Sequence, residues 1–343
     1  MSEIVPGRVS VSLLTYQGRR WIEGSIESLR GQTHSDIELV VVDNGSSDGT
    51  TEWLREHVAA MPNATLIEAG TNMGFARGHN EGIARTTGQY VCLLNQDVIL
   101  DPAFLVAVTT ALANRPEAAA VQAKVLRLLD GGERSSTLDT TGLVFHRDRR
   151  ILSRGQGEDD ADQYEHGGGV FGADGPCPVY RRLALEQARE PRGGGGWEYL
   201  DEDFFLYHED TDLAWRLRLM GWDTIYEPGA VAWHARGFSA EATSSVTAIA
   251  LHHRRTSRSA NVYAWRNRRL MIAKNDTGSL LLPDLPWFLA REIASLGLMA
   301  VTDPRRLVAV PRLAAALPAA FRKRRWIQRQ KRVGRREFRR WII

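Results

Sequence analysis

Residues 37–50 read IELVVVDNGSSDGT, and this stretch decides the fold. The run Ile37–Val42 is apolar without interruption, which is typical of a strand buried on both faces of a parallel sheet. It stops at a polar loop whose Ser and Asp side chains can cap a helix over Thr51–Val58. A buried strand that leads directly into a helix is the repeating unit of α/β proteins.

The same alternation continues on both sides of this stretch. Arg8–Thr15 alternates and is rich in β-formers, so we expect a strand, and Trp21–Gly31 has apolar residues at helical spacing before a closing glycine. Three further elements are expected downstream, a strand, a helix and a strand: Ala64–Glu68, Gly78–Arg85 and Tyr90–Leu94. This order predicts βαβ units, hence an α/β fold with a mostly parallel open sheet flanked by helices.

The composition is that of an ordinary globular protein. The chain has 343 residues, 43% hydrophobic and 25% charged, which is ample for a substantial core. The two cysteines are too few for a disulfide framework, and Cys92 lies in the apolar run Tyr90–Leu94, so we expect a reducing compartment. No secretory signal pattern is visible. The apolar stretch 280–301 is interrupted by Asp284, Arg291 and Glu292, so we do not expect it to span a membrane.

Charge is distributed unevenly. Residues 304–343 contain 14 Lys or Arg and one acid, a net charge of +13, so residues 1–303 carry −10 of the total of +3. From Arg322 to Ile343 the cations, eleven of them within residues 322–340, alternate with Trp, Ile, Phe and Val. This pattern favours an amphipathic helix on an anionic membrane, and removal of residues 304–343 should then release the protein from membranes. Nucleic-acid binding, which the acidic body disfavours, and a simply solvated helix are the alternatives.

The middle of the chain is less regular. Residues 130–170 are rich in polar turns, with a hairpin expected near Leu143–Phe145, and the four-glycine run Gly193–Gly196 predicts a loop or a lid over an acceptor. After Ala240 the pattern becomes helical and basic. We therefore expect one domain over residues 1–240 and a helical extension over residues 241–343.

Polar segments stop at the ends of three expected strands: Thr15-Tyr16, Asp43-Asn44 and Asn95-Gln96-Asp97. Ligands of open parallel sheets bind at the carboxyl ends of the strands, so these segments should converge on one crevice. Asp43 can accept a hydrogen bond from a base, and Asp97 can bind Mg²⁺ or Mn²⁺, which prefer oxygen ligands. The alternatives are local: a turn or cap for Asp43, and an N-cap before Asp101-Pro102 for Asp97.

A second stretch predicts acid–base chemistry. Residues 204–216 read FFLYHEDTDLAWR, in which aromatic residues run into three acids. Acids beside an apolar wall lose solvation and repel one another, which can prepare a carboxylate as a general base. Asp212 and Arg216 are four residues apart on an expected helix, so we expect an ion pair there. A solvated helix start is the alternative for Asp210.

Five blocks of the sequence, which follow one another in the expected order, resemble inverting nucleotide-sugar glycosyltransferases of family two. The resemblance covers about residues 8–240. The blocks are LLTY at 13–16, VVDNGSSDGT at 41–50, NMGFARGHN at 72–80, LNQD at 94–97 and EDTDL at 209–213. The resemblance implies a GT-A fold over residues 1–240, with a nucleotide-binding half to about residue 100 and an acceptor half beyond it. It also implies a role for each matching residue. For the nucleotide-sugar it implies Thr15, Tyr16, Asp43 (at the pyrimidine), Asn72, Gly74, Phe75, Arg77 (near phosphate), Asn80, Asn95 and Gln96.

The remaining implied roles concern metal and catalysis. Asn95-Gln96-Asp97 stands where the family usually has Asp-x-Asp, and this variant is similar to that of rhamnosyltransferase-like members. It leaves Asp97 as the metal ligand and lowers the negative charge of the metal site. His234, in WHARG, matches a histidine near the metal or diphosphate, although a structural role is the alternative. Asp210 matches the catalytic base, with Glu209 as the rival. Asp174, otherwise a loop turn, and Asp212 are candidates for acceptor contact.

The resemblance thus implies metal-dependent, inverting transfer of a sugar from a UDP- or dTDP-sugar to an acceptor hydroxyl, with a rhamnosyl donor as a mild preference. The acceptor is expected to be a lipid-linked or cell-envelope glycan, and the enzyme to lie in the cytoplasm at the inner face of the membrane. A nucleotidyltransferase acting on sugar phosphates is an alternative, but no basic glycine-rich loop stands at Thr15–Arg20. A non-catalytic glycan-binding relative is another, and the retention of Asp43, Asp97 and Asp210 argues against it.

Overall fold

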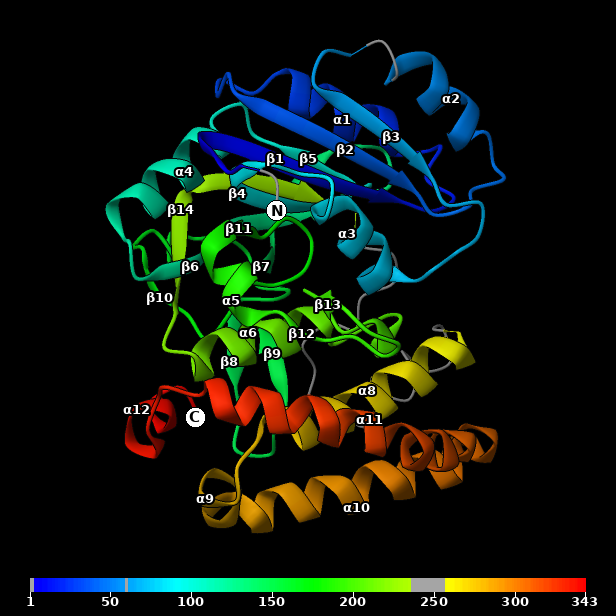
Figure 1. Ribbon diagram of the computed structural model, residues 1–343, viewed down its shortest axis with the longest axis vertical. Coiled ribbons are helices and arrows are strands. Elements are labelled where there is room, and N and C mark those ends of the chain that lie inside the picture. Colours follow the sequence, from blue (N-terminus) through cyan, green and yellow to red (C-terminus); the bar gives the residue numbers. More distant parts are fainter. Residues whose placement is uncertain (1–2, 59–60, 236–256) are drawn as a thin grey trace.

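The computed structural model describes residues 3–58, 61–235 and 257–343. Its first half has the predicted alternation of strands and helices, shown in blue and cyan in Figure 1. The elements are β1 Val5–Thr15, α1 Ile22–Arg30, β2 Ile37–Asp43, α2 Thr50–His57, β3 Ala64–Glu68, α3 Phe75–Ile83 and β4 Gly88–Asn95. Helix α3 begins three residues earlier than we predicted, directly after Gly74, whose φ of 86° ends the preceding loop.

These strands form one side of a large mixed sheet in the order β10-β14-β6-β11-β4-β1-β2-β3. Strand β1 runs parallel to both β2 and β4, and β2 runs parallel to β3, so the mostly parallel arrangement is confirmed. The second half adds β5 Val98–Leu100, α4 Phe104–Asn114, β6 Ala118–Leu128, β7 Arg134–Thr140, β10 Gly168–Gly169, β11 Val179–Arg181 and β14 Asp223–His234. Strand β11 is antiparallel to its neighbours β4 and β6, whereas β14 runs parallel to β6.

Helices cover both faces of the sheet. One core cluster joins β1, β2 and β4 to α1, α2 and α4, and Cys92 is fully buried within it, as predicted. On the other face, α3 packs with α5 Arg182–Ala188 and α6 Glu209–Leu219. Two small hairpins lie beside these helices: β8 Leu143–Phe145 with β9 Ile151–Ser153, which confirms the predicted hairpin, and β12 Glu190–Pro191 with β13 Trp197–Glu198. The glycine run forms the turn of the second hairpin, with positive φ at Gly194, Gly195 and Gly196.

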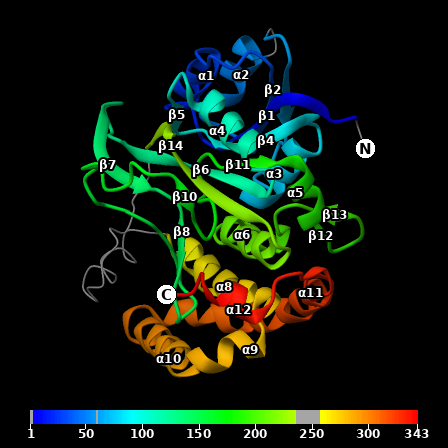
Figure 2. The same ribbon diagram turned by 90° about the vertical axis from the view of Figure 1, so that its left-hand side faces the viewer.

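The C-terminal region is helical and lies at the end of the molecule opposite β3 and α2 (Figures 1 and 2). Its elements are α8 Arg258–Asn275, α9 Gly278–Leu281, η2 Leu282–Asp284, α10 Leu285–Thr302, η3 Pro304–Val308, α11 Ala309–Gln330 and α12 Arg335–Arg339. The domain boundary that we predict at residue 240 falls in residues 236–256, outside the described part of the chain.

The prediction that the basic tail is a free membrane-binding helix is wrong, because much of the tail belongs to the hydrophobic core. Ile327 and Phe338 are fully buried in a cluster that also contains Trp215 of α6 and Leu270 of α8. The aromatic and aliphatic residues between the cations therefore pack against the body. Several of the cations face inward too: Lys323 is 3% exposed, and its ammonium lies 2.7 Å from a carboxylate oxygen of Glu198.

Helix α10 lies in the apolar stretch for which we predict no membrane span, and this stays a prediction. The segment Gly278–Thr302 has the length and mean hydropathy, 1.2, of a membrane-spanning helix, and 6% of its most apolar window is buried. The charges that argued against a span turn toward the protein: Asp284 is 1% exposed and pairs with Arg149 and Arg339, and Glu292 pairs with arginines of α8. The outward face of α10 is consequently apolar.

Candidate functional site

The ends of β1, β2 and β4 meet at one cleft. In the sheet register Thr15 lies beside Asp43, and Leu14 lies beside Asn95, so the polar segments that follow these strands share one edge. The cleft has a volume of about 390 Å³. Seven of the predicted site residues line it, namely Tyr16, Asn72, Gly74, Phe75, Asn95, Gln96 and Asp97, together with Leu14, Asn44, Phe205 and Leu206.

Gln96 fixes the loop that follows β1. Its amide oxygen accepts hydrogen bonds from the Thr15 hydroxyl, at 2.6 Å, and from the Tyr16 backbone N–H, at 2.8 Å. Thr15 is 1% exposed, so it supports the cleft from beneath, whereas Tyr16 is exposed at its rim. Gly18 completes the turn because a Cβ there would lie 2.2 Å from the Thr15 hydroxyl oxygen.

Asn44 shapes the opposite wall, and our list of site residues omitted it. Its Nδ2 donates to Asn72 Oδ1 and to the Gly74 carbonyl oxygen, both at 3.2 Å, and its Oδ1 accepts from the Met73 N–H at 2.8 Å. Gly74 allows this loop to touch the acceptor half, because a Cβ at Gly74 would lie 2.6 Å from the Phe205 carbonyl oxygen. The signal for Asn44 was its place directly after Asp43 at a strand end.

Three predicted nucleotide contacts lie elsewhere. Asp43 is 2% exposed, and its carboxylate accepts hydrogen bonds from the Ser46 N–H and the Thr51 hydroxyl, as in the turn-and-cap alternative. Asn80 is buried, and both ends of its amide bond the backbone of residues 199–200, so it is a structural clamp and not part of the cleft wall. Arg77 is exposed on α3 and does not line the cleft.

A histidine and a second acid lie close to Asp97, at one end of the cleft. His234, the last residue of β14, has Nε2 3.4 Å from Asp97 Oδ1 and Nδ1 2.9 Å from Asp139 Oδ2. Burial by itself lowers the pKa of His234, but Asp97 and Asp139 outweigh it and raise that pKa to about 9. Sequence reasoning missed Asp139, which lies on β7 with no recognisable motif around it.

These residues fit a divalent cation. Asn95 Oδ1 is buried and has no hydrogen-bond partner among the described residues, so it is an oxygen donor without a use in the protein alone. Together with Asp97, and with His234 once a cation displaces its proton, it offers two oxygens and one imidazole nitrogen. Mg²⁺ and Mn²⁺ accept such ligands and take their remaining positions from water or phosphate. Asp139 would hold the imidazole by its second nitrogen.

The predicted base stands at the start of α6. Asp210 is half-buried, and burial, followed by the charge of Asp174, raises its pKa to about 7. Gly175 permits this closeness, because a Cβ there would lie 2.9 Å from Asp210 Oδ2. Glu209, the rival, is 5% exposed, and burial followed by Asp210 raises its pKa well above the usual range. Burial thus makes Glu209 the harder of the two acids to ionise, which leaves Asp210 as the better base.

A strained loop connects Asp210 to the cleft at the strand ends, which we call the donor cleft because its lining matches the residues predicted to bind the donor. Phe205, Tyr207 and His208 all have positive φ, between 64° and 72°, although none is glycine. Such backbone costs about 1–2 kcal/mol per residue. Asn267 of α8 holds the loop: its Nδ2 donates to the carbonyl oxygens of Phe204 and Leu206, both at 2.8 Å, and of Tyr207, at 3.0 Å.

The prediction that Asp212 contacts the acceptor is wrong, because its carboxylate is fully buried and fully paired. The predicted ion pair with Arg216 is present at 2.9 Å, and the ammonium of Lys274 lies 2.9 Å from the same oxygen. Asp212, Glu190 and Asp201 come close enough together to hold a metal ion. The cation among them is Lys274, whose Nζ also lies 2.7 Å from Glu190 Oε1, so this cluster is a buried ion-pair network. Asp174 is 7% exposed and accepts from Ser153, so it acts on Asp210 through its charge.

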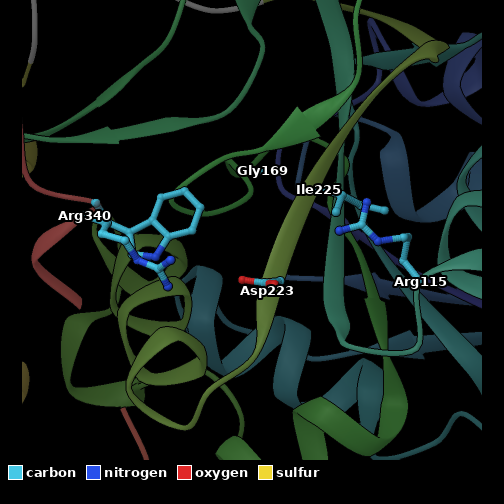
Figure 3. A pocket seen from close by; sticks show the side chains of 6 residues that line it. Arg115, Gly169, Asp223, Ile225 and Arg340 are labelled. Carbon is cyan, nitrogen blue, oxygen red and sulfur yellow. The ribbon is translucent and has the colours of Figure 1, made fainter. Parts of the chain in front are cut away.

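A separate hollow of about 310 Å³ lies at the other end of β14 (Figure 3). Asp223, the first residue of the strand, stands between Arg115 and Arg340 there, whereas His234 is the last residue of the same strand. The carboxylate of Asp223 pairs with Arg218. This hollow therefore does not join the donor cleft.

Comparisons with known proteins agree with the fold. Residues 10–188, slightly more than half of the chain, match the family described as glycosyl transferase family 2. The chain is 26% identical over 276 residues to the N-acetylglucosaminyl-diphospho-decaprenol L-rhamnosyltransferase of Mycobacterium tuberculosis, which covers 75% of this chain and 83% of that protein. It is 32% identical over 89 residues to a putative teichuronic acid biosynthesis glycosyltransferase of Bacillus subtilis, covering 26% and 35% of the two chains.

Solved structures share the architecture. The mannosyltransferase of Pyrobaculum calidifontis in complex with GDP-Man and Mn²⁺ superimposes with a TM-score of 0.51 at 20% identity, covering 93% of this chain and 87% of that one. TarS residues 1–349 of S. aureus in complex with UDP gives 0.50 at 16% identity, covering 97% and 91%. The predicted GT-A fold is confirmed. The chain belongs to glycosyl transferase family 2, and it is a glycosyltransferase of GT-A fold with a helical C-terminal region packed against the catalytic half.

Proposed function

We propose that the protein is a metal-dependent, inverting glycosyltransferase that moves a sugar from a UDP- or dTDP-sugar to an acceptor hydroxyl. The observation that carries this proposal is the unpaired oxygen of Asn95, which lines the same cleft as Asp97, the partner of His234. A buried oxygen without a partner is costly unless a ligand or an ion satisfies it.

The residues of the cleft suggest how each part of the donor is held. Tyr16, Asn72 and Phe75 line the wall and provide an aromatic face and amide groups for a nucleoside. Asn95, Asp97 and His234 would hold the cation, which supplies charge stabilisation to a departing diphosphate when it is bound. Asp43 contributes through the turn that it stabilises at the end of β2.

Asp210 is the proposed general base. With a pKa of about 7 it is partly ionised at neutral pH, so it can take the proton of an acceptor hydroxyl as that oxygen attacks the anomeric carbon. A single displacement from the face opposite the diphosphate inverts the anomeric centre and needs no covalent intermediate on the protein. The Mycobacterium tuberculosis relative is named as a rhamnosyltransferase, which supports a rhamnosyl donor here.

The acceptor is proposed to be a lipid-linked glycan of the cell envelope, and the enzyme to lie in the cytoplasm at the inner face of the membrane. The apolar outward face of α10 supports this placement, with Trp287, Leu289 and Ile293 exposed by 50%, 46% and 71%. A helix with such a face can lie in the plane of an interface. Exposed arginines of α11 and α12 add attraction to anionic lipids. We thus propose that the membrane contact is made by α10 and the exposed arginines of α11 and α12, and not by a free tail as we predicted.

Thermal-shift measurements with nucleoside diphosphates and their sugars, with and without Mn²⁺, test the proposal. We expect stabilisation by a uridine or thymidine diphosphate sugar that depends on the metal, since ligands that bind only the folded state raise its apparent stability. Indifference to all of these ligands would count against a nucleotide-sugar enzyme. Stabilisation by nucleoside triphosphates instead would favour the nucleotidyltransferase alternative.

A further inference from the structure

A second cavity, of about 560 Å³, lies between α8 and α10 and is unusually rich in arginine. Five guanidinium groups line it: Arg150, Arg268, Arg269, Arg291 and Arg306. No acid lines it among the described residues. This concentration of one charge inside the folded region needs an explanation beyond packing.

Among the described residues, the carboxylates that pair with these arginines are fewer than the arginines themselves. Glu292 is shared, with Arg268 at 2.5 Å and Arg269 at 2.6 Å. Arg150 pairs with Asp148 at 2.7 Å, and Arg306 pairs with Asp303 at 3.3 Å.

Arg291 is the fifth guanidinium and makes no ion pair with the described residues. Burial, and then the charges of Arg150 and Arg268, lower its pKa. The Nε of Arg268 is buried without a hydrogen-bond partner among the described residues. The cavity therefore carries an excess of positive charge and an unused donor, both of which an anion would satisfy.

One wall of the cavity is apolar. Leu298, Met299 and Val301 of α10 line it, and Trp265 of α8 faces them, with its indole N–H donating to Ser295 at 3.1 Å. Val301 is 84% exposed, so this wall continues onto the outward face of α10. A ligand that fits both walls would carry an anionic group and a hydrocarbon chain.

The cavity also adjoins the loop 205–208, which precedes the proposed base Asp210. His208 lines it, two residues before Asp210, while Phe205 and Leu206 of the same loop line the donor cleft. The loop 205–208 therefore separates the two hollows, and the proposed base follows it directly. A molecule held in the arginine-rich cavity would lie across this loop from the donor cleft.

We propose that this cavity binds the diphosphate of a lipid-diphosphate-linked acceptor, with the lipid chain leaving along the apolar face of α10. The inference rests on the proposed transferase function and deepens it by naming the acceptor class. Guanidinium groups form paired hydrogen bonds to phosphate oxygens, and several of them can neutralise a diphosphate. The sugar attached to that diphosphate would extend toward Asp210.

Binding of a short lipid diphosphate tests the proposal directly. Farnesyl diphosphate is titrated into the full-length protein by calorimetry, alongside farnesol, inorganic pyrophosphate and UDP without metal. We expect farnesyl diphosphate to bind at least tenfold more tightly than each of the other three. Equal binding of pyrophosphate would indicate a general anion site, and equal binding of farnesol a general apolar site, and either result would overturn the proposal.

Two variants locate the binding. Arg291→Gln removes a guanidinium that makes no ion pair with the described residues, and Gly297→Phe places a ring at a position where a Cβ meets nothing within 4 Å. Both should weaken farnesyl diphosphate binding about tenfold or more. The control is Arg335→Gln, which removes the same charge from the exposed start of α12 and should bind like the wild type. Wild-type binding by both cavity variants would contradict the site.

The same preparations separate this inference from the function on which it rests. Binding of UDP- or dTDP-sugars in the presence of Mn²⁺ is measured in each. If these donors bind but lipid diphosphate shows no preference, the cavity assignment alone fails. If no donor binds, the transferase proposal fails whatever occupies the cavity.

Discussion

The side-chain amide of Asn267 donates a hydrogen bond of 2.8 Å to the carbonyl oxygen of Leu206. The two residues are 61 positions apart in the chain, one in the C-terminal helices and one in the loop that lines the donor cleft. Because that loop runs directly into Asp210, the C-terminal region helps to position the proposed base. It is therefore part of the catalytic unit in structural terms.

Replacing Asn267 with Ala should lower kcat far more than it weakens donor binding. The change removes three hydrogen bonds from a strained loop, and a displacement of about 1 Å at a reacting group can cost about 100-fold in rate. Steady-state transfer assays and donor calorimetry measure the two effects. Gln328→Ala, which removes an amide that bonds the Asn275 carbonyl oxygen, is the matched control and should keep a near-normal kcat. A proportional loss of donor affinity in Asn267→Ala would show a merely structural role.

The rate of transfer should rise with pH through about 7, because Asp210 must be ionised to accept a proton. Asp174 raises the pKa of Asp210 by repulsion, so Asp174→Asn should lower that pKa and move the rise to lower pH, by about one unit. The measurement is the pH dependence of kcat/KM for both proteins. A rise at unchanged or higher pH in the variant would contradict the assignment of Asp210.

Asn95→Asp should tighten Mn²⁺ binding, since it restores a negative charge to the proposed metal site. We expect about a tenfold lower Mn²⁺ concentration for half-maximal activity. Asp97→Asn should act in the opposite direction, and treatment with a chelator should abolish transfer by the wild type. Titration of Mn²⁺ against activity measures all three. Equal metal requirements in the two variants would place the cation elsewhere.

Membrane binding should depend on α10 and not on a detachable tail. Ile293→Glu places a charge on the outward apolar face and should reduce flotation with anionic vesicles, while Glu56→Gln, at the far end of the molecule, should not. Removing residues 304–343 is expected to unfold the protein instead of releasing it cleanly. That deletion strips Lys323 from its buried acids, and breaking a buried ion pair costs about 3–5 kcal/mol. A folded, soluble truncated protein would contradict this account.

The sequence was sufficient to predict the nucleotide-binding half because its signals are local. The apolar run Ile37–Val42 and the polar residues after it specify both a buried strand and the position of its end. Parallel strands then bring their ends together, so Tyr16, Asn95 and Asp97 could be placed in one cleft before the structure was known.

Residues whose partners are distant could not be placed in this way. Asp139 acts on His234 across 95 positions, and Asn267 acts on a loop 60 positions away, with no pattern that pairs them. The basic tail misled for the same reason. The composition shows that Lys323 is charged, but not that Glu198, Asp201 and Asp203 neutralise it in the folded protein.

The most direct test of the central claim is donor binding and transfer measured together in Asp210→Asn. The substitution keeps the shape of the side chain and removes its ability to accept a proton. The account predicts that the variant binds a UDP- or dTDP-sugar with Mn²⁺ as the wild type does, while the transfer rate falls by about 100-fold or more. Near-normal transfer by this variant would contradict the assignment of the base.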